Sequence, residues 1–214
     1  MSIRVKLYAA LAVTIAGLIA TAGVGIVGMS RLGDRFDEVQ AASRAQALAL
    51  QLKYDVTDFN GWQTAYGYDN GASRPTFLTS VQRFRADFAQ ARRQLTRTRE
   101  QAYLDQVEQA FADFMRLDDQ AFAALQAGDK AKVKDIFLGP ELTIFTRAAA
   151  AAQRLAGYEA ERVSTEDDEF KDARREALRL LIAVSAIAGL LVVILLITAN
   201  DLARAAEGRL AEAE

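Results

Sequence analysis

The chain has no histidine and no cysteine among its 214 residues. Without these residue types it cannot form a disulfide, a Ser-His-Asp triad, a phosphorylated histidine or the usual zinc sites. Proline occurs only twice. This scarcity, together with abundant alanine, leucine, arginine, glutamine and glutamate, favours long uninterrupted helices. We therefore expect a helical protein that is not an enzyme and that needs neither a cofactor nor a metal ion.

An excess of positive charge is also missing. Lysine and arginine together number 26, aspartate and glutamate number 28, and the formal net charge is −2. Binding to nucleic acid depends on a surplus of cations, because they displace the counterions of the phosphates. The charge balance therefore argues against a nucleic-acid partner.

Two segments contain no charged residue, residues 7–30 and residues 180–200. A helix needs roughly 20 apolar residues to cross the hydrocarbon core of a bilayer. We therefore predict two transmembrane helices and a two-pass protein of the cell's inner or plasma membrane, with the lipid bilayer as a partner. A cleavable signal peptide is the alternative for the first segment, because Thr21, Ala22 and Gly23 are small, but its apolar run is longer than a typical signal core.

Two spans place both termini on one side of the membrane. Arg4, Lys6 and the amino terminus favour a cytoplasmic start. The basic residues just before the second span count against this orientation, but long intervening segments are translocated largely regardless of charge. We expect cytoplasmic tails at residues 1–6 and 201–214, with residues 31–178 outside the cytoplasm.

Apolar residues between the two spans recur with the helical period. Asp118 interrupts one of these apolar lines. Breaks fall at residues 67–75, at a capping box from Thr98 to Gln101, at Gly128, and at residues 139–140, where a last helix should begin. The pattern predicts an all-α fold, an antiparallel up-down four-helix bundle between two transmembrane helices.

The opening MSIRVKLYAALAVTIAGLIATAGVGIVGMSRLGD resembles the start of a bacterial methyl-accepting chemotaxis receptor. The stretch AGDKAKVKDIF is similar to the same family's four-helix-bundle sensor domain, and the resemblance covers roughly residues 1–200. It implies a dimeric receptor that binds a small ligand outside the membrane and relays a displacement of its last bundle helix to the cytoplasm. Similar domains precede histidine kinases and diguanylate cyclases, so the sensory half of such a protein is one alternative. A membrane-anchored structural or interaction protein without a ligand is another.

The chain departs from this family in two ways. Only residues 201–214 follow the second span, which is too short for a relay or catalytic domain. We therefore expect the cytoplasmic signalling module to lie outside this chain. Family members that bind amino acids use arginines on the distal part of the first bundle helix, and residues 54–69 contain none. Specificity for amino acids is therefore not implied.

The densest polar segment is YDVTDFNGWQTAYGYDN, residues 54–70. Five of its residues recur every three or four positions and should share a helical face. They are Asp55, Asp58, Trp62, Tyr66 and Asp69. This combination of carboxylates and aromatic rings suits a cationic or hydrogen-bonding ligand. Alternatively, the aromatic residues here, including Phe59, pack in the core and the polar residues solvate the helix end.

The start of the last bundle helix should lie opposite this segment and contribute Thr143 and Arg147. Arg147 is expected to pair with Asp58 or Asp69, or to bind a carboxylate of the ligand. Near the membrane, only two helices are available to cover an apolar line on the first helix. We therefore predict a homodimer interface there. Its residues are Leu32, Phe36 and Val39.

Overall fold

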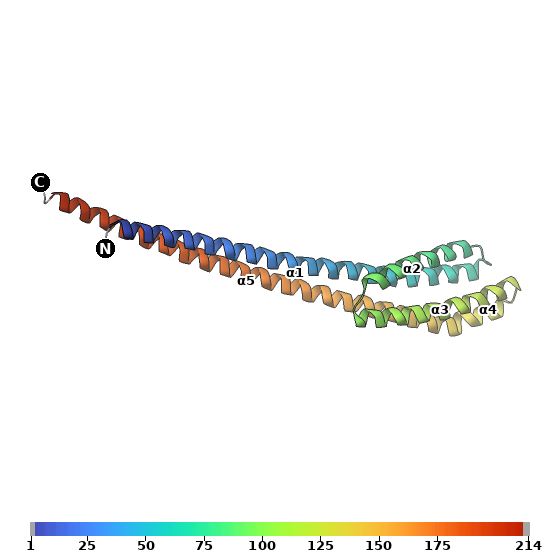
Figure 1. The fold of residues 1–214 in the computed structure, drawn as a ribbon. Coiled ribbons are helices and arrows are strands. Elements are labelled where there is room, and N and C mark those ends of the chain that lie inside the picture. Colours follow the sequence, from blue (N-terminus) through green and yellow to red (C-terminus); the bar gives the residue numbers. More distant parts are fainter. Residues whose placement is uncertain (1–2, 212–214) are drawn as a thin grey trace. The chain divides into compact units, whose positions relative to one another are not determined.

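The computed structural model describes residues 3–211, and it contains helices and short connections but no strand in that range (Figure 1). The helices are α1 (Ile3–Tyr68), α2 (Arg74–Gln94), α3 (Thr98–Gln126), α4 (Lys130–Ile136), the π-helical turn η1 (Phe137–Glu141) and α5 (Leu142–Ala211). The predicted all-α class is thus confirmed. The outer ends of the two expected tails, residues 1–2 and 212–214, lie outside the described residues, as do the side chains of Arg4 and Lys6.

Helices α1 and α5 contain the two uncharged segments. Within the described residues these are the two helices long and apolar enough to cross a membrane, and none of the residues in their most apolar stretches is buried. Large aliphatic side chains such as Ile19, Ile182 and Leu196 are exposed instead. Exposed apolar side chains over this length are what contact with lipid requires. The two helices therefore have the composition of membrane spans.

The chain divides into two compact units, Met1–Glu38 with Asp167–Glu214 and Val39–Glu166. In the first unit α1 and α5 lie side by side in opposite directions (Figure 1). A Cβ atom placed on Gly17 would lie 3.6 Å from the Cβ of Ala188, and one on Gly28 would lie 3.6 Å from the Cβ of Ala177. Because glycine faces alanine at both levels, the two backbones approach closely.

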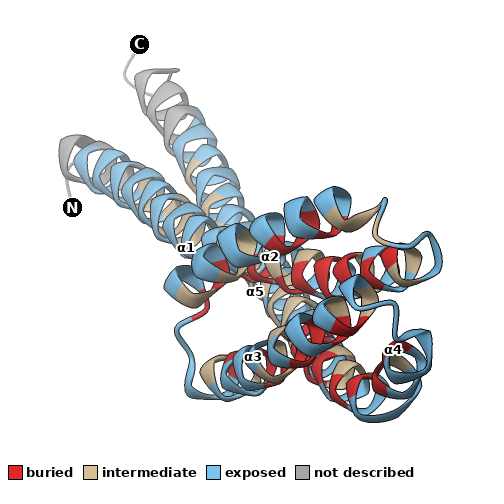
Figure 2. Cartoon of the chain, turned by 90° about the vertical axis from the view of Figure 1, so that its right-hand side faces the viewer, coloured by how far each residue is buried: buried red, intermediate tan, exposed pale blue. Residues whose placement is uncertain are grey.

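The second unit has its own apolar core, to which α1, α2, α3 and α5 all contribute (Figure 2). At its centre the ring of Phe59 lies 4.9–5.5 Å from the rings of Phe84, Phe111 and Phe114. The α5 side of this core consists largely of alanines, among them Ala148, Ala151 and Ala152. Large rings on three helices and small side chains on the fourth together fill the interior.

Several predicted helix boundaries are confirmed. Pro75 lies in the first turn of α2, where its missing N–H costs nothing. Gly128 follows α3 with a φ of +76°, a left-handed conformation that glycine adopts readily. Asn70 and Gly71 have positive φ values in the turn between α1 and α2.

Another predicted boundary is wrong in detail. The capping interaction of α3 begins one residue early, because the backbone N–H of Arg97 donates to Glu100 Oε2 at 2.8 Å. The Gln101 side chain instead donates to the backbone oxygen of Leu95. The predicted break at residues 139–140 is confirmed. The backbone of Gly139 is non-helical, with a φ of −109° and a ψ of −106°, so the chain kinks there before it continues into α5.

Candidate functional site

Two of the predicted ligand-binding carboxylates, Asp55 and Asp58, contact the same arginine of α2. Asp55 Oδ1 accepts from Arg83 Nε at 3.1 Å, and Asp58 Oδ2 accepts from Arg83 Nη2 at 2.6 Å. Asp55 is fully buried. Burial raises its pKa to about 6, the nearby Asp87 adds to this rise, and Arg83 opposes it. Both carboxylates are thus occupied by a partner on α2.

The other predicted residues of α1 lie in different surroundings. Tyr66 is fully buried in the core, whereas 39% of Trp62 is exposed. Asp69 accepts the backbone N–H of Ser73 at 3.0 Å, and its pKa is lowered chiefly by a hydrogen bond from the Ser73 hydroxyl. The alternative that Phe59, Trp62 and Tyr66 pack in the core therefore holds for Phe59 and Tyr66 but not for Trp62.

The predicted pairing of Arg147 with Asp58 or Asp69 is wrong. Arg147 Nη2 donates to Asp113 Oδ2 on α3 at 3.2 Å, because α5 presents this side chain to α3 rather than to α1. The Thr143 hydroxyl donates to the backbone oxygen of Gly139 at 3.3 Å. Asp55 and Asp58 are therefore brought together, and the remaining predicted residues are not gathered around one space.

A buried polar group that the sequence did not predict lies around Asp118 of α3. Its Oδ1 accepts from Gln63 Nε2 at 3.0 Å and from Arg74 Nη1 at 2.8 Å, and it also accepts the Tyr66 hydroxyl. Its Oδ2 lies 2.7 Å from Arg74 Nη1. We call Gln63, Tyr66, Arg74, Asp118 and the nearby Glu141 the Asp118 cluster. Three helices thus meet at one fully buried carboxylate.

Arg74 is held by aromatic rings as well as by Asp118. Its guanidinium carbon lies 4.2 Å from the ring centre of Phe122, 4.8 Å from that of Tyr66 and 5.0 Å from that of Phe77. Aromatic faces attract a cation, and the attraction is stronger where water is excluded. Only 13% of the Arg74 side chain is exposed. The first residue of α2 is therefore fixed to both α1 and α3.

Glu141, the last residue of η1, is buried, and its Oε2 has no hydrogen-bond partner among the described residues. Burial raises its pKa to about 9, and the negative charge of Asp118 adds to the rise. Glu141 is therefore protonated at neutral pH. A buried carboxyl group with a strongly raised pKa is more common at functional sites than elsewhere.

The placement of η1 depends on Gly67. A Cβ atom at this position would lie 2.3 Å from Cε2 of Phe137, so only glycine allows the ring to lie against α1. The same Phe137 ring contacts Tyr66, with ring centres 6.0 Å apart. The kink at Gly139 lies within this segment, and it sets the start of α5 against the end of α1.

One signal in the sequence pointed to this cluster. Asp118 occupies a position on the apolar line of its helix, and a carboxylate there must be paired when it is buried. Nothing local marks Gln63, Arg74 or Glu141 as its neighbours, because they lie on other elements of the fold.

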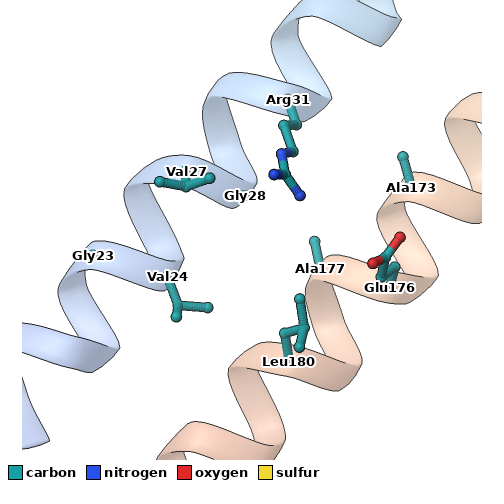
Figure 3. A pocket seen from close by; sticks show the side chains of 9 residues that line it. All are labelled: Gly23, Val24, Val27, Gly28, Arg31, Ala173, Glu176, Ala177 and Leu180. Carbon is teal, nitrogen blue, oxygen red and sulfur yellow. The ribbon is translucent and has the colours of Figure 1, made fainter.

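The first unit contains a separate cavity of about 250 Å³ between α1 and α5 (Figure 3). Its walls are mainly small or aliphatic, with one charged residue from each helix, Arg31 and Glu176. The lining residues are Gly23, Val24, Val27, Gly28, Arg31, Ala173, Glu176, Ala177 and Leu180. Glu176 is its one carboxylate, and no histidine, lysine, serine or threonine lines it.

No protein-family model, curated protein or solved structure matches the chain. Among the residues that the structure describes, no group of three acidic side chains is placed to hold a metal ion. What the geometry offers is a buried, charged cluster where the ends of several helices meet.

Proposed function

We propose that this chain is a transmembrane sensor of the chemoreceptor type, which detects a signal outside the cytoplasm and transmits it across the membrane. In this proposal residues 31–178 form an antiparallel up-down four-helix bundle outside the cytoplasm, and both termini are cytoplasmic. The sensor proposal rests on one observation. A helical unit with a separate core is inserted between two apolar stretches of membrane length.

The continuity of α5 supports a role in transmission. Its 70 residues run as one helix from Leu142, directly after η1, through the second uncharged segment. A hydrogen-bonded helix transmits an axial or rotational displacement along its length, because its backbone bonds resist bending and stretching. A change at η1 or in the Asp118 cluster would thus act on the first turns of the same helix that contains the second uncharged segment.

Dimerisation through α1 is part of the same proposal. Phe36 is 49% exposed and contacts one ring, that of Phe170, at 6.1 Å between ring centres. Leu32 and Val39 are half-buried. A second copy would cover the exposed part of Phe36, at about 25 cal/mol for each Å² of apolar surface removed from water.

A membrane-anchored interaction protein without a ligand is the second candidate. The packing of the predicted site favours it, because Asp55 and Tyr66 are fully buried and already paired within the chain. The exposed Trp62 favours the sensor, since it leaves one aromatic face for a ligand.

The orientation is tested with single cysteines in this cysteine-free chain. We expect an impermeant thiol reagent to label Ala112→Cys from outside intact cells and to label Asp201→Cys only after the cells are opened. The reverse pattern would overturn the proposed topology.

Signalling is tested by joining the full chain to the cytoplasmic signalling part of a chemotaxis receptor. A defined panel of amino acids, organic acids, sugars and amines is then added from outside, and the kinase output is recorded. We expect at least one solute to change the output. A correctly oriented, assembled fusion that responds to no member of the panel would favour the interaction protein.

A further inference from the structure

The second unit contains a cavity of about 250 Å³ that is well separated in sequence from the Asp118 cluster. It lies between α1, the connection from α2 to α3, and α5. We call it the arginine pocket, because three of its lining residues are arginines. The lining consists of Ala41, Arg44, Ala45, Leu48, Gln94, Leu95, Thr96, Arg97, Glu100 and Arg162.

Two of these arginines have no acidic partner within ion-pair distance among the described residues, although Arg97 also acts electrostatically on Glu159. Arg44 and Arg97 are exposed, and among the described residues neither forms an ion pair. The one hydrogen bond of the Arg44 guanidinium runs from Nε to the backbone oxygen of Gln40, at 3.3 Å. Both guanidinium groups therefore keep free donors in the geometry that matches a carboxylate.

The third arginine is paired but not fully satisfied. Arg162 Nη1 donates to Glu100 Oε1 at 2.9 Å and to Glu159 Oε2 at 2.7 Å. Its Nε is buried and has no hydrogen-bond partner among the described residues. A buried donor without an acceptor is uncommon in folded proteins, and an acceptor supplied by a ligand would remove the deficit.

The acidic residues beside the pocket do not neutralise it. Both oxygens of Glu100 are already used, one by Arg162 and the other by the backbone N–H of Arg97 at 2.8 Å. Burial raises the pKa of Glu159 to about 7, and a hydrogen bond with Glu100 adds to the rise while Arg162 opposes it. At neutral pH these two carboxyl groups carry less than two negative charges, against three arginines.

The pocket also has an apolar wall. Ala45 and Leu95 are buried, and Leu48 is half-buried beside them. A volume of about 250 Å³ is close to that of eight water molecules at about 30 Å³ each. The first turn of α3 begins at Thr98, and its free backbone N–H groups add positive potential at this end.

We propose that the arginine pocket binds a small aliphatic carboxylate. Arg44 and Arg97 hold the carboxylate, and the hydrocarbon part lies against Ala45, Leu48 and Leu95. This site is separate from the tip residues considered above, and its occupancy is measured without any signalling output. A ligand here would join α1, the α2–α3 connection and α5 at one point.

The test is calorimetric titration of succinate into the full chain in lipid nanodiscs, with sodium chloride replacing succinate in the reference so that ionic strength stays constant. We expect a dissociation constant of about 1 mM or tighter. We expect R44Q and R97Q each to weaken binding about tenfold. Both side chains are exposed and unpaired, so the melting temperature should not change.

R93Q is the matched control, because Arg93 is exposed on α2, lies outside the pocket and likewise has no ion pair among the described residues. It should leave binding within about twofold. Inorganic phosphate tests the apolar wall, and we expect it to bind at least about tenfold more weakly than succinate.

Three results would overturn the proposal. They are no heat from succinate at millimolar concentration, equal weakening by R93Q, and equal affinity for phosphate and succinate. The outcome is independent of the sensor proposal. Suppose that succinate binds to the chain but the fusion protein gives no kinase output. That result would support the arginine pocket and would contradict only the sensor proposal.

Discussion

Replacing Asp118 with asparagine tests whether the Asp118 cluster holds the ends of α1, α2 and α3 together. The substitution preserves the shape of the side chain and removes its charge. Arg74 would then remain, 13% exposed and surrounded by three aromatic rings, without an acidic partner. Removing one partner of a buried ion pair typically costs 3–5 kcal/mol, because the other charge stays desolvated.

We therefore expect Asp118→Asn to reduce the free energy of unfolding by about 4 kcal/mol. This is a large fraction of the 5–15 kcal/mol that is typical of a whole domain. The melting temperature should fall by on the order of 15 °C, at about 4 °C for each kcal/mol. The assay is thermal unfolding of the full chain in detergent micelles, followed by circular dichroism and by the fluorescence of Trp62.

The double variant Asp118→Asn with Arg74→Met removes both charges, while the asparagine oxygen can still accept from Gln63 and Tyr66. It should recover much of the lost stability, because no buried cation is left without a partner. Asp105→Asn is the control, because Asp105 pairs with Arg92 but its side chain is 64% exposed, and its loss should cost no more than about 1 kcal/mol. A loss below about 1 kcal/mol in Asp118→Asn, or no recovery in the double variant, would refute this reasoning.

Two further predictions concern the contact between η1 and α1. The pKa of Glu141 is about 9 in the folded chain and 4.5 as its ordinary value. Folding therefore favours the protonated form, and this stabilisation is complete below pH 4.5 and is lost as the pH rises towards 9, by roughly 1.4 kcal/mol for each pH unit. Glu141→Gln should make the melting temperature depend less steeply on pH between about pH 5.5 and 8.5, while the raised pKa values of Asp55 and Glu159 keep part of the slope in that range. An unchanged slope would contradict the buried, protonated state. Gly67→Ala places a Cβ atom 2.3 Å from the Phe137 ring and should cost about 1–3 kcal/mol in thermal unfolding. Phe137→Leu should restore part of that loss, and additive losses in the double variant would show that the two residues do not meet.

Features governed by local chemistry could be predicted from the sequence. Pro75 and Gly128 determine nearby helix ends through their own backbone preferences, and the uncharged segments of α1 and α5 follow from composition alone. Gly67 was expected to end the first helix, yet α1 continues to Tyr68. The reason is distant in sequence, since the missing side chain makes room for Phe137.

The candidate site was only partly predictable, because its partners lie far apart along the chain. Asp118 pairs with an arginine 44 residues earlier, and no local pattern specifies that distance. Arg147 was assigned to acidic residues of α1, but the rotation of α5 about its axis directs it to Asp113 of α3. The break at Gly139 was predicted, but the burial of Glu141 beside it was not, because that burial depends on the other helices packed around it.

The glycine–alanine contacts between α1 and α5 limit how the spans can move. Gly17 and Gly28 are eleven residues apart, as are Ala177 and Ala188. Eleven residues make three turns at 3.67 residues each, so both contacts recur on one side of each helix. The contact of Gly17 with Ala188 and the contact of Gly28 with Ala177 therefore form or break together.

A slip of one helical turn, about 5.4 Å, would bring Val184 or Val192 opposite Gly17 in place of Ala188. The matching slip would bring Ala173 or Leu181 opposite Gly28. The observed register is thus the one in which an alanine lies opposite glycine at both levels, and a slip of one turn would place a larger, branched side chain against the α1 backbone at Gly17.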